Sequence, residues 1–271
     1  MTATGNYLAR TLKFLKRKKV FDITGYALIL MGFFWFVITG AEKQGYFWQW
    51  YRIPPYLFQF ENNVFTAGPI LQGLQVTLKI VGISLVLTYI FGLVTALMRL
   101  SNSAGARIMA RFYLESTRNT PLLVQLYFVY FIVAPVLNID RISAAVLALS
   151  LFEGAYASEI YRAGIVSINR GQWEAAYSLG LSNFDMYKDI LLPQAIRRIL
   201  PPLTGQAISL IKDSSLVSVI AVYEMTMQAN AIVAETFLVF EVYFTIAAVY
   251  LVITISLSQL VNLMERRMKI V

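Results

Sequence analysis

Residues 74–98 read LQVTLKIVGISLVLTYIFGLVTALM, an apolar run that contains one charged side chain, Lys79. A helix needs roughly 20 mostly apolar residues to cross about 30 Å of hydrocarbon. This run is long enough, and it lacks the period-two alternation of a strand. It therefore predicts a membrane-spanning helix, with Lys79 close enough to the outer end for its side chain to reach water.

Five more runs have the length and apolar character of a span, or nearly so. They cover residues 21–40, 120–138, 142–161, 203–222 and 242–261. Residues 139–141 separate two of these runs and predict a tight helical hairpin, whereas KDSS at 212–215 interrupts the run 203–222. We expect an all-α membrane protein with six transmembrane helices and no strands.

The composition excludes several classes of protein. Of 271 residues, 58% are hydrophobic and 14% are charged, and there is no cysteine or histidine. A soluble globular domain is nearer to half apolar and a quarter charged, so a free cytosolic enzyme or a disordered chain is excluded. Without cysteine and histidine there are no disulfides, thiol nucleophiles or Ser-His-Asp triads, and the usual zinc and haem sites are absent.

The positions of lysine and arginine predict the orientation in the membrane. Most of the 23 basic residues fall in the N-terminal tail and in the segments that return to its side of the membrane. Because cytoplasmic loops carry the excess of lysine and arginine, we expect both termini to be cytoplasmic. A cleaved signal peptide is the alternative for residues 21–40, but the run is longer than a typical signal core.

The aromatic segment 46–56 follows the first span and is typical of a membrane interface. Pro54-Pro55 within it predicts that no helix forms there. We treat residues 1–68 as an N-terminal tail, an extra helix and this interfacial loop.

The longest cytoplasmic segment, residues 162–202, predicts two short helices. The first covers 172–179 and ends at Gly180, which supplies a left-handed residue. Ser182 can cap the second helix, Pro193 is expected to end it, and Pro201-Pro202 closes the segment. From composition alone, docking on a partner and lying flat on the chain's own membrane domain are equally supported.

Several motifs along residues 70–265 resemble one family in their order and spacing. They are GLQVTL at 73–78, RNTPLLVQ at 118–125, GAYASEIYRAGI at 154–165, GQWEAA at 171–176, LPQA at 192–195 and KDSSL at 212–216. With Gly180 and ILLP at 190–193, the segment around Glu174-Ala175-Ala176 resembles the EAA loop of ABC importer permeases, in the polar amino acid branch. The resemblance implies a five-helix permease core over residues 69–271.

The resemblance also implies a set of roles and partners. The EAA loop would be a coupling helix that docks on a separate ATPase, through Gln172, Glu174, Ala175, Ala176, Leu179 and Gly180. The implied partners are two ABC ATPase subunits, a second permease that is identical or homologous, and a periplasmic or lipid-tethered amino-acid-binding protein, in a bacterial cytoplasmic membrane. This chain has no glycine followed by lysine and hence no phosphate-binding loop. ATP and Mg²⁺ are therefore expected on the partner ATPases, no cofactor on this chain, and no nucleic acid as a partner.

Charged residues inside the spans are the candidates for the substrate path. Glu153 lies about 16 Å into its span at 1.5 Å per residue, near the depth where transporters commonly hold substrate. Tyr156 shares its face, and Gly154 begins a run of small residues. A structural bond to a neighbouring helix is the alternative for Glu153. A carboxylate there favours a neutral or basic polar amino acid.

Lys212 and Asp213 lie at the interruption of the fifth predicted span, a place where discontinuous helices can contact a polar ligand. Packing against other helices is equally supported. Glu159 is expected to pair with Arg162 at spacing i,i+3.

The leading function is a transmembrane permease subunit of an importer for polar amino acids. An ion-coupled secondary transporter or channel would explain the spans equally well but would give the cytoplasmic loop no role. A membrane-embedded enzyme has little support, since there is no histidine, cysteine or converging acidic cluster.

Overall fold

The computed structural model describes residues 24–40, 42–43, 45–61 and 64–268, and it divides the chain into two compact units, Met1–Trp50 and Tyr51–Val271. The described part of the first unit contains an apolar helix, Thr24–Gly40. It corresponds to the predicted span 21–40, of which residues 21–23 lie outside the described residues, as does the basic N-terminal tail.

A small hairpin precedes the long helices of the second unit, contrary to the expectation of no strands. The elements here are η1 (Trp50–Arg52), α2 (Pro54–Leu57), β1 (Phe58–Glu61) and β2 (Val64–Ala67). The two strands pair antiparallel, with Phe58 opposite Ala67. Four-residue strands are too short for a period-two pattern to stand out. The expectation that Pro54-Pro55 prevents a helix was also wrong, because α2 begins at this pair. Proline is tolerated in the first helical positions, since the N–H groups there have no partner within the helix.

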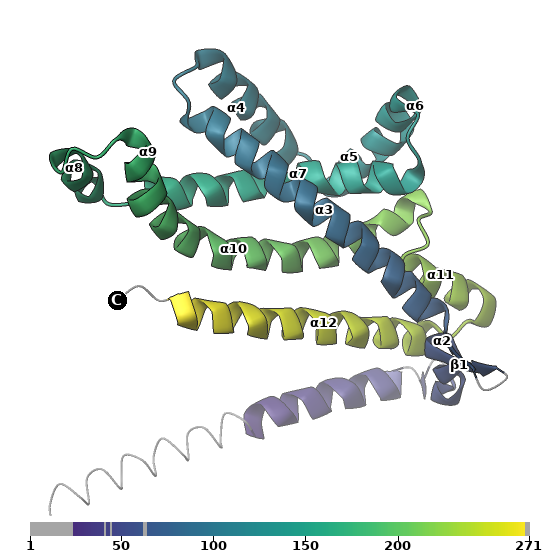
Figure 1. The fold of residues 1–271 in the computed structure, drawn as a ribbon. Helices are drawn as coiled ribbons and strands as arrows, with labels where there is room; N and C mark the ends of the chain where they lie inside the picture. Colours follow the sequence, from purple (N-terminus) through teal and green to yellow (C-terminus); the bar gives the residue numbers. More distant parts are fainter. Residues whose placement is uncertain (1–23, 41, 44, 62–63, 269–271) are drawn as a thin grey trace, which may run out of the picture. The chain divides into compact units, whose positions relative to one another are not determined.

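The second unit is otherwise built from helices. They are α3 (Pro69–Leu100), α4 (Ala104–Arg118), α5 (Leu122–Phe128), the π-helical η2 (Val129–Val133), α6 (Ala134–Leu137), α7 (Arg141–Val166), α8 (Arg170–Ser178), α9 (Asn183–Asp185), the π-helical η3 (Met186–Leu191), α10 (Leu192–Asp213), the 3₁₀ helix η4 (Ser214–Ile220), α11 (Met225–Thr236) and α12 (Val239–Met268). In Figure 1, α3 crosses α7, while α10 and α12 lie side by side, and α8 and α9 lie at one end.

The core is formed mainly where α3 packs on α7, the most extensive helix pair. The buried face of α3 is rich in small residues, including Gly73, Ser84, Gly92 and Ala96. A Cβ placed on Gly92 would lie 2.7 Å from Ala157 Cβ. Small residues let helix backbones approach closely, which is a common way for helices to associate in membranes.

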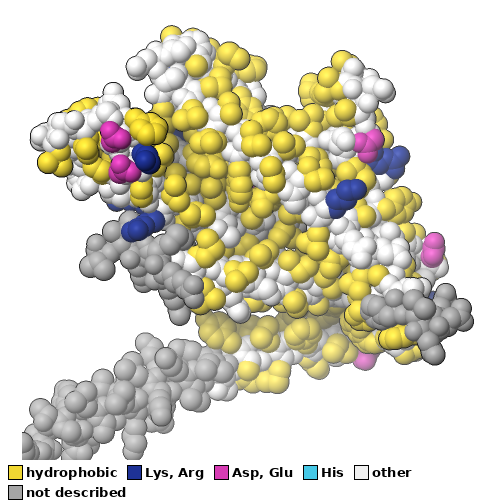
Figure 2. Space-filling view, viewed as in Figure 1, with side chains coloured by type: hydrophobic (Ala, Val, Ile, Leu, Met, Phe, Trp, Pro, Cys, Tyr) yellow, Lys and Arg dark blue, Asp and Glu magenta, His cyan; other side chains and the backbone are white. Residues whose placement is uncertain are grey.

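The predicted all-α membrane class is confirmed apart from the hairpin. In the part of the chain that the structure describes, α3 and α12 are long and apolar enough to cross a membrane. Counting the bent pairs α4 with α5–α6, and α9–η4 with α11, as single spans raises this number to four. The count of six stays a prediction. In Figure 2 the visible face of the second unit is largely hydrophobic, with charged side chains gathered toward its two ends.

The helix boundaries after α7 differ from the sequence-based ones. Neither Pro193 nor Pro201-Pro202 ends a helix: Pro193 lies in the first turn of α10, and the proline pair lies inside it. A proline inside a helix removes one backbone hydrogen bond and bends the helix, and in a membrane bundle neighbouring groups can satisfy the freed carbonyl. The predicted interruption at 212–215 is confirmed, because α10 ends at Asp213 and continues as the 3₁₀ helix η4. The predicted hairpin is also confirmed, with Asn138 in the left-handed region between α6 and α7.

Candidate functional site

The first candidate site is the α8 helix, whose ends are fixed by local hydrogen bonds. Asn169 caps its start, since its side-chain oxygen accepts from the Gly171 N–H at 2.8 Å. Gly180 follows its end with φ +70°, as the sequence predicted. Ser182 then caps α9 by accepting from the Asp185 N–H at 3.2 Å. These caps hold α8 and α9 in a defined turn.

The predicted docking residues do not all face outward. Gln172, Glu174, Ala175, Leu179 and Gly180 are exposed, and 76% of the Leu179 side chain is accessible. Ala176, in contrast, is fully buried.

Ala176 lies in a cluster with Ile168, Met186 and Leu191. Its position makes it a packing residue that joins α8 to η3.

Aromatic and aliphatic side chains give α8 and α9 an apolar outer surface. Trp173 packs edge-to-face on Tyr187, with ring centroids 5.5 Å apart. Tyr177, Leu179 and Phe184 are more than half exposed. Exposed aromatic anchors of this kind are typical of protein interfaces, and in Figure 1 α8 and α9 project beyond the ends of the long helices.

The α8–α9 turn is joined to the interior without a break in helical structure. Helix α9, η3 and α10 follow one another directly from Asn183 to Asp213. Gln194 on α10 also donates to the Gln172 side chain at 3.1 Å. The outer surface and the inner end of α10 are therefore parts of one connected element.

The second candidate site lies where α10 meets α7. Glu153 on α7 is 1% exposed, and its carboxylate accepts a hydrogen bond from the Gln206 side chain on α10. Asp213 and Lys212 lie near enough to Glu153 for their charges to act on its carboxylate. Gln206 and Asp213 are seven residues apart, so they share one face of the helix. The structure thus brings together three residues that the sequence singled out: Glu153, Lys212 and Asp213.

The other two predicted path residues have different surroundings. Gly154 is buried, and a Cβ there would lie 3.0 Å from Phe91 Cβ and 3.1 Å from the Tyr113 hydroxyl. It therefore permits close packing of α7 against α3 and α4. Tyr156 packs on Phe152 and lies under the guanidinium of Arg118, 5.8 Å from the ring centroid.

Gln206 was missed at the sequence level, although a glutamine inside the apolar run 203–222 was a usable signal. Residues 204–209 around it are all half-buried. Glu153 has the helix-to-helix bond that the structural alternative expected. The same bond places the Glu153 carboxylate of α7 against a half-buried turn of α10 that carries the Gln206 amide.

Glu159 forms the centre of an ion-pair cluster near the end of α7. Its carboxylate pairs with Arg99 at 2.8 Å, Arg118 at 3.1 Å and Arg162 at 3.2 Å. The Arg162 pair confirms the prediction. The other two were missed because their arginines come from α3 and α4, far away in sequence.

Comparison with known proteins gives consistent matches. The family model "Binding-protein-dependent transport system inner membrane component" matches residues 88–270. The chain is 39% identical over 217 residues to the "Glutamine transport system permease protein GlnP" of Escherichia coli (strain K12), covering 78% of this chain and 99% of that one. It is 40% identical over 202 residues to the "Arginine transport system permease protein ArtQ" of Bacillus subtilis (strain 168), covering 74% and 92%.

A solved structure also matches in fold and sequence. The "Crystal structure of an amino acid ABC transporter with histidines" superposes with a TM-score of 0.69 at 39% identity, covering 73% of this chain and 94% of that chain.

Proposed function

The chain belongs to the family of binding-protein-dependent transport system inner membrane components, and we propose on this premise how it takes part in transport. It is a permease subunit of an ABC importer for polar amino acids, located in a membrane. The matches favour this function over an ion-coupled transporter or channel. The observation that carries the mechanism is a capped, exposed α8 joined directly to α10.

The proposed substrate is a neutral or basic polar amino acid. The relatives are named for glutamine and arginine transport. Glu153 supplies a buried carboxylate beside Gln206, which suits a ligand with an ammonium or guanidinium group. We propose Glu153, Tyr156, Lys212 and Asp213 for the translocation path, with Gly154 allowing the helices around it to pack closely.

The proposed assembly contains two ABC ATPase subunits, a second permease and an amino-acid-binding protein. ATP and Mg²⁺ bind to the ATPases, whereas this chain binds no cofactor and catalyses no hydrolysis. Both termini lie in the cytoplasm of a bacterial cell, as the distribution of basic residues favours. Residues 69–271 form the permease core, and residues 1–68 form an addition to it.

The proposed mechanism begins when the ATPases close on nucleotide and move α8, through Gln172, Glu174, Ala175, Leu179 and Gly180. Ala176 contributes by holding α8 on η3. Movement of α10 then changes the distance of Gln206 and Asp213 from Glu153, which opens the polar cluster to one side of the membrane or the other.

The docking role is tested by Leu179→Asn, with Leu137→Asn as a matched control. Both leucines are more than half exposed, but Leu137 lies at the end of α6, away from α8. The permease is co-expressed with its ATPase and reconstituted in liposomes with the binding protein. We expect Leu179→Asn to lower ATP-dependent uptake and ATPase co-purification about tenfold, the equivalent of ~1.4 kcal/mol of docking energy. Full-rate uptake by the permease alone, without ATPase, would refute the proposed function.

The translocation role is tested by Glu153→Gln. Glu224→Gln is the control, because Glu224 is also a buried glutamate. Uptake of arginine and glutamine is measured for each variant. We expect Glu153→Gln to weaken the apparent affinity for arginine more than that for glutamine, because only arginine loses a countercharge. Unchanged selectivity would remove Glu153 from the substrate path.

A further inference from the structure

Helix α4 presents three kinds of surface around its circumference. Its buried face packs on the rest of the unit through Ala110, Leu114 and Thr117. A second stripe is cationic and consists of Arg107, Arg111 and Arg118, spaced so that they lie on one side of the helix. A third face is apolar yet exposed, formed by Ile108, Met109 and Phe112, with accessible fractions of 68%, 66% and 75%.

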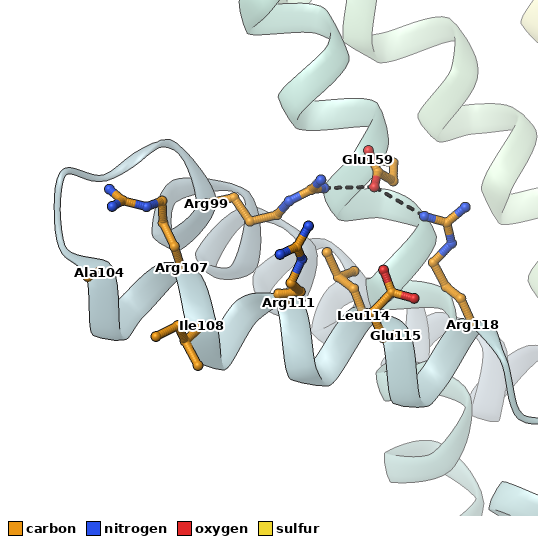
Figure 3. A pocket seen from close by; sticks show the side chains of 9 residues that line it. All are labelled: Arg99, Ala104, Arg107, Ile108, Arg111, Leu114, Glu115, Arg118 and Glu159. Atoms are coloured by element: carbon orange, nitrogen blue, oxygen red, sulfur yellow. Dashed lines mark hydrogen bonds and ion pairs between the residues drawn. The ribbon is translucent and has the colours of Figure 1, made fainter.

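The cationic stripe opens into a cavity of about 520 Å³ between α4, the end of α3 and α7. Figure 3 shows the guanidiniums of Arg107, Arg111 and Arg118 on the same side of α4 as Arg99. Four arginines and two glutamates, Glu115 and Glu159, line the cavity. The lining therefore carries two positive charges in excess.

The two acidic groups of the cavity differ: arginines neutralise Glu159, whereas Glu115 accepts a hydrogen bond only from a neutral amide. Glu159 is shared by Arg99, Arg118 and Arg162, and Glu115 accepts from the Asn119 side chain at 3.0 Å. Arg107 donates to the Ser101 carbonyl at 2.9 Å.

Among the described residues, Arg111 pairs with no acidic group, and its side chain is exposed. The positive charge that no ion pair neutralises therefore lies at Arg107 and Arg111, with the Glu115 carboxylate one helical turn from Arg111.

Helix α4 is set at a steep angle to the helix that follows it. Its axis is bent by 109° from the following helix, Leu122–Leu137. A helix with an exposed apolar face beside a cationic one is typical of helices that lie in the membrane interface. The basic residues put this interface on the cytoplasmic side.

We propose that this cavity binds the phosphate group of an anionic phospholipid of the inner leaflet. Arg107 and Arg111 contact the phosphate, for which the planar guanidinium is well suited. Ile108, Met109 and Phe112 lie among the acyl chains. A free phosphate could bind the arginines in the same way, but it has no acyl chains to cover the exposed apolar face of α4. The cationic stripe and the apolar face together therefore favour a lipid.

The test uses the purified complex, stripped of lipid in detergent and titrated with dioleoylphosphatidylglycerol, dioleoylphosphatidylcholine or inorganic phosphate. Native mass spectrometry measures the lipid bound at each concentration. We expect the anionic lipid to bind in preference to the zwitterionic one. Replacing both arginines, as Arg107→Gln with Arg111→Gln, should weaken that binding roughly 10- to 30-fold, as expected for the loss of two surface cations.

The matched control is Arg52→Gln with Lys79→Gln, which removes the same charge from the same unit but outside the cavity. This pair should bind phosphatidylglycerol as the parent does. Arg107→Lys with Arg111→Lys keeps the charge but loses the planar guanidinium, so its affinity for phosphatidylglycerol should fall between that of the parent and that of the glutamine pair. The proposal is overturned if the glutamine pair behaves like its control. It is also overturned if inorganic phosphate displaces phosphatidylglycerol at similar concentration, since the ligand would then be a free anion.

Discussion

The close approach of α3 and α7 at Gly92 allows a sharp test of how the core is packed. A Cβ on Gly92 would lie 2.7 Å from Ala157 Cβ and 3.1 Å from the Ser158 backbone nitrogen. Non-bonded carbon atoms are most stable about 3.5–4.0 Å apart. Gly92→Ala therefore forces the two helices apart by roughly 1 Å. We expect a loss of about 1–3 kcal/mol in the free energy of unfolding, the usual effect of overpacking.

Gly82 provides the matched control on the same helix. It is exposed, and a Cβ there meets nothing within 4 Å. Gly82→Ala makes the same gain in helix propensity, about 1 kcal/mol in a helix interior, without the clash. The equal gain cancels between the two variants, so they should differ by the cost of the clash, about 1–3 kcal/mol. Thermal unfolding of the parent and both variants in one detergent measures the difference. Equal melting temperatures for Gly92→Ala and Gly82→Ala would refute the packing argument.

Three further substitutions test individual contacts. Glu159→Gln removes the carboxylate shared by three arginines. We expect the free energy of unfolding to fall by about 1–2 kcal/mol at low salt and by less at high salt, because partly exposed ion pairs are weak and screened. An equal loss at both ionic strengths in thermal unfolding contradicts this. Glu224→Ala removes the cap of α11, which accepts from the Met227 N–H at 2.8 Å, and the acceptor of the Tyr250 hydroxyl, and should lower the free energy of unfolding by about 1–3 kcal/mol in chemical unfolding; a change near zero would show that water replaces the carboxylate. The hydrogen bond from Ser143 holds the pKa of Asp140 below its ordinary value. The stability that Asp140 contributes is therefore present above about pH 4 and is lost as the pH falls further. The melting temperatures of Asp140→Ala and the parent should differ near neutral pH and converge in acid, whereas a difference that does not change with pH would exclude this linkage.

The parts of the fold that follow from local chemistry were predictable from the sequence. Gly180 and Ser182 act on their own neighbours, so the end of α8 and the start of α9 follow from residue type. The long apolar runs likewise predict α3 and α12, because hydrocarbon thickness sets their length.

The parts that depend on tertiary contacts were not predictable. Pro201-Pro202 breaks a helix in water, yet α10 continues through it because packing supports the segment. Gln206 acquires its role only when α10 lies against Glu153. Ala176 belongs to a motif associated with docking, but burial in three dimensions makes it a packing residue.

The unbroken helical path from Asn183 to Asp213 has a mechanical consequence. The path includes the π-helical η3 and three prolines of α10, and these are the kinds of place where a helix bends. In the proposed mechanism, the motion of α8 is therefore divided between bending at these positions and displacement of the inner end of α10, where Gln206 donates to Glu153.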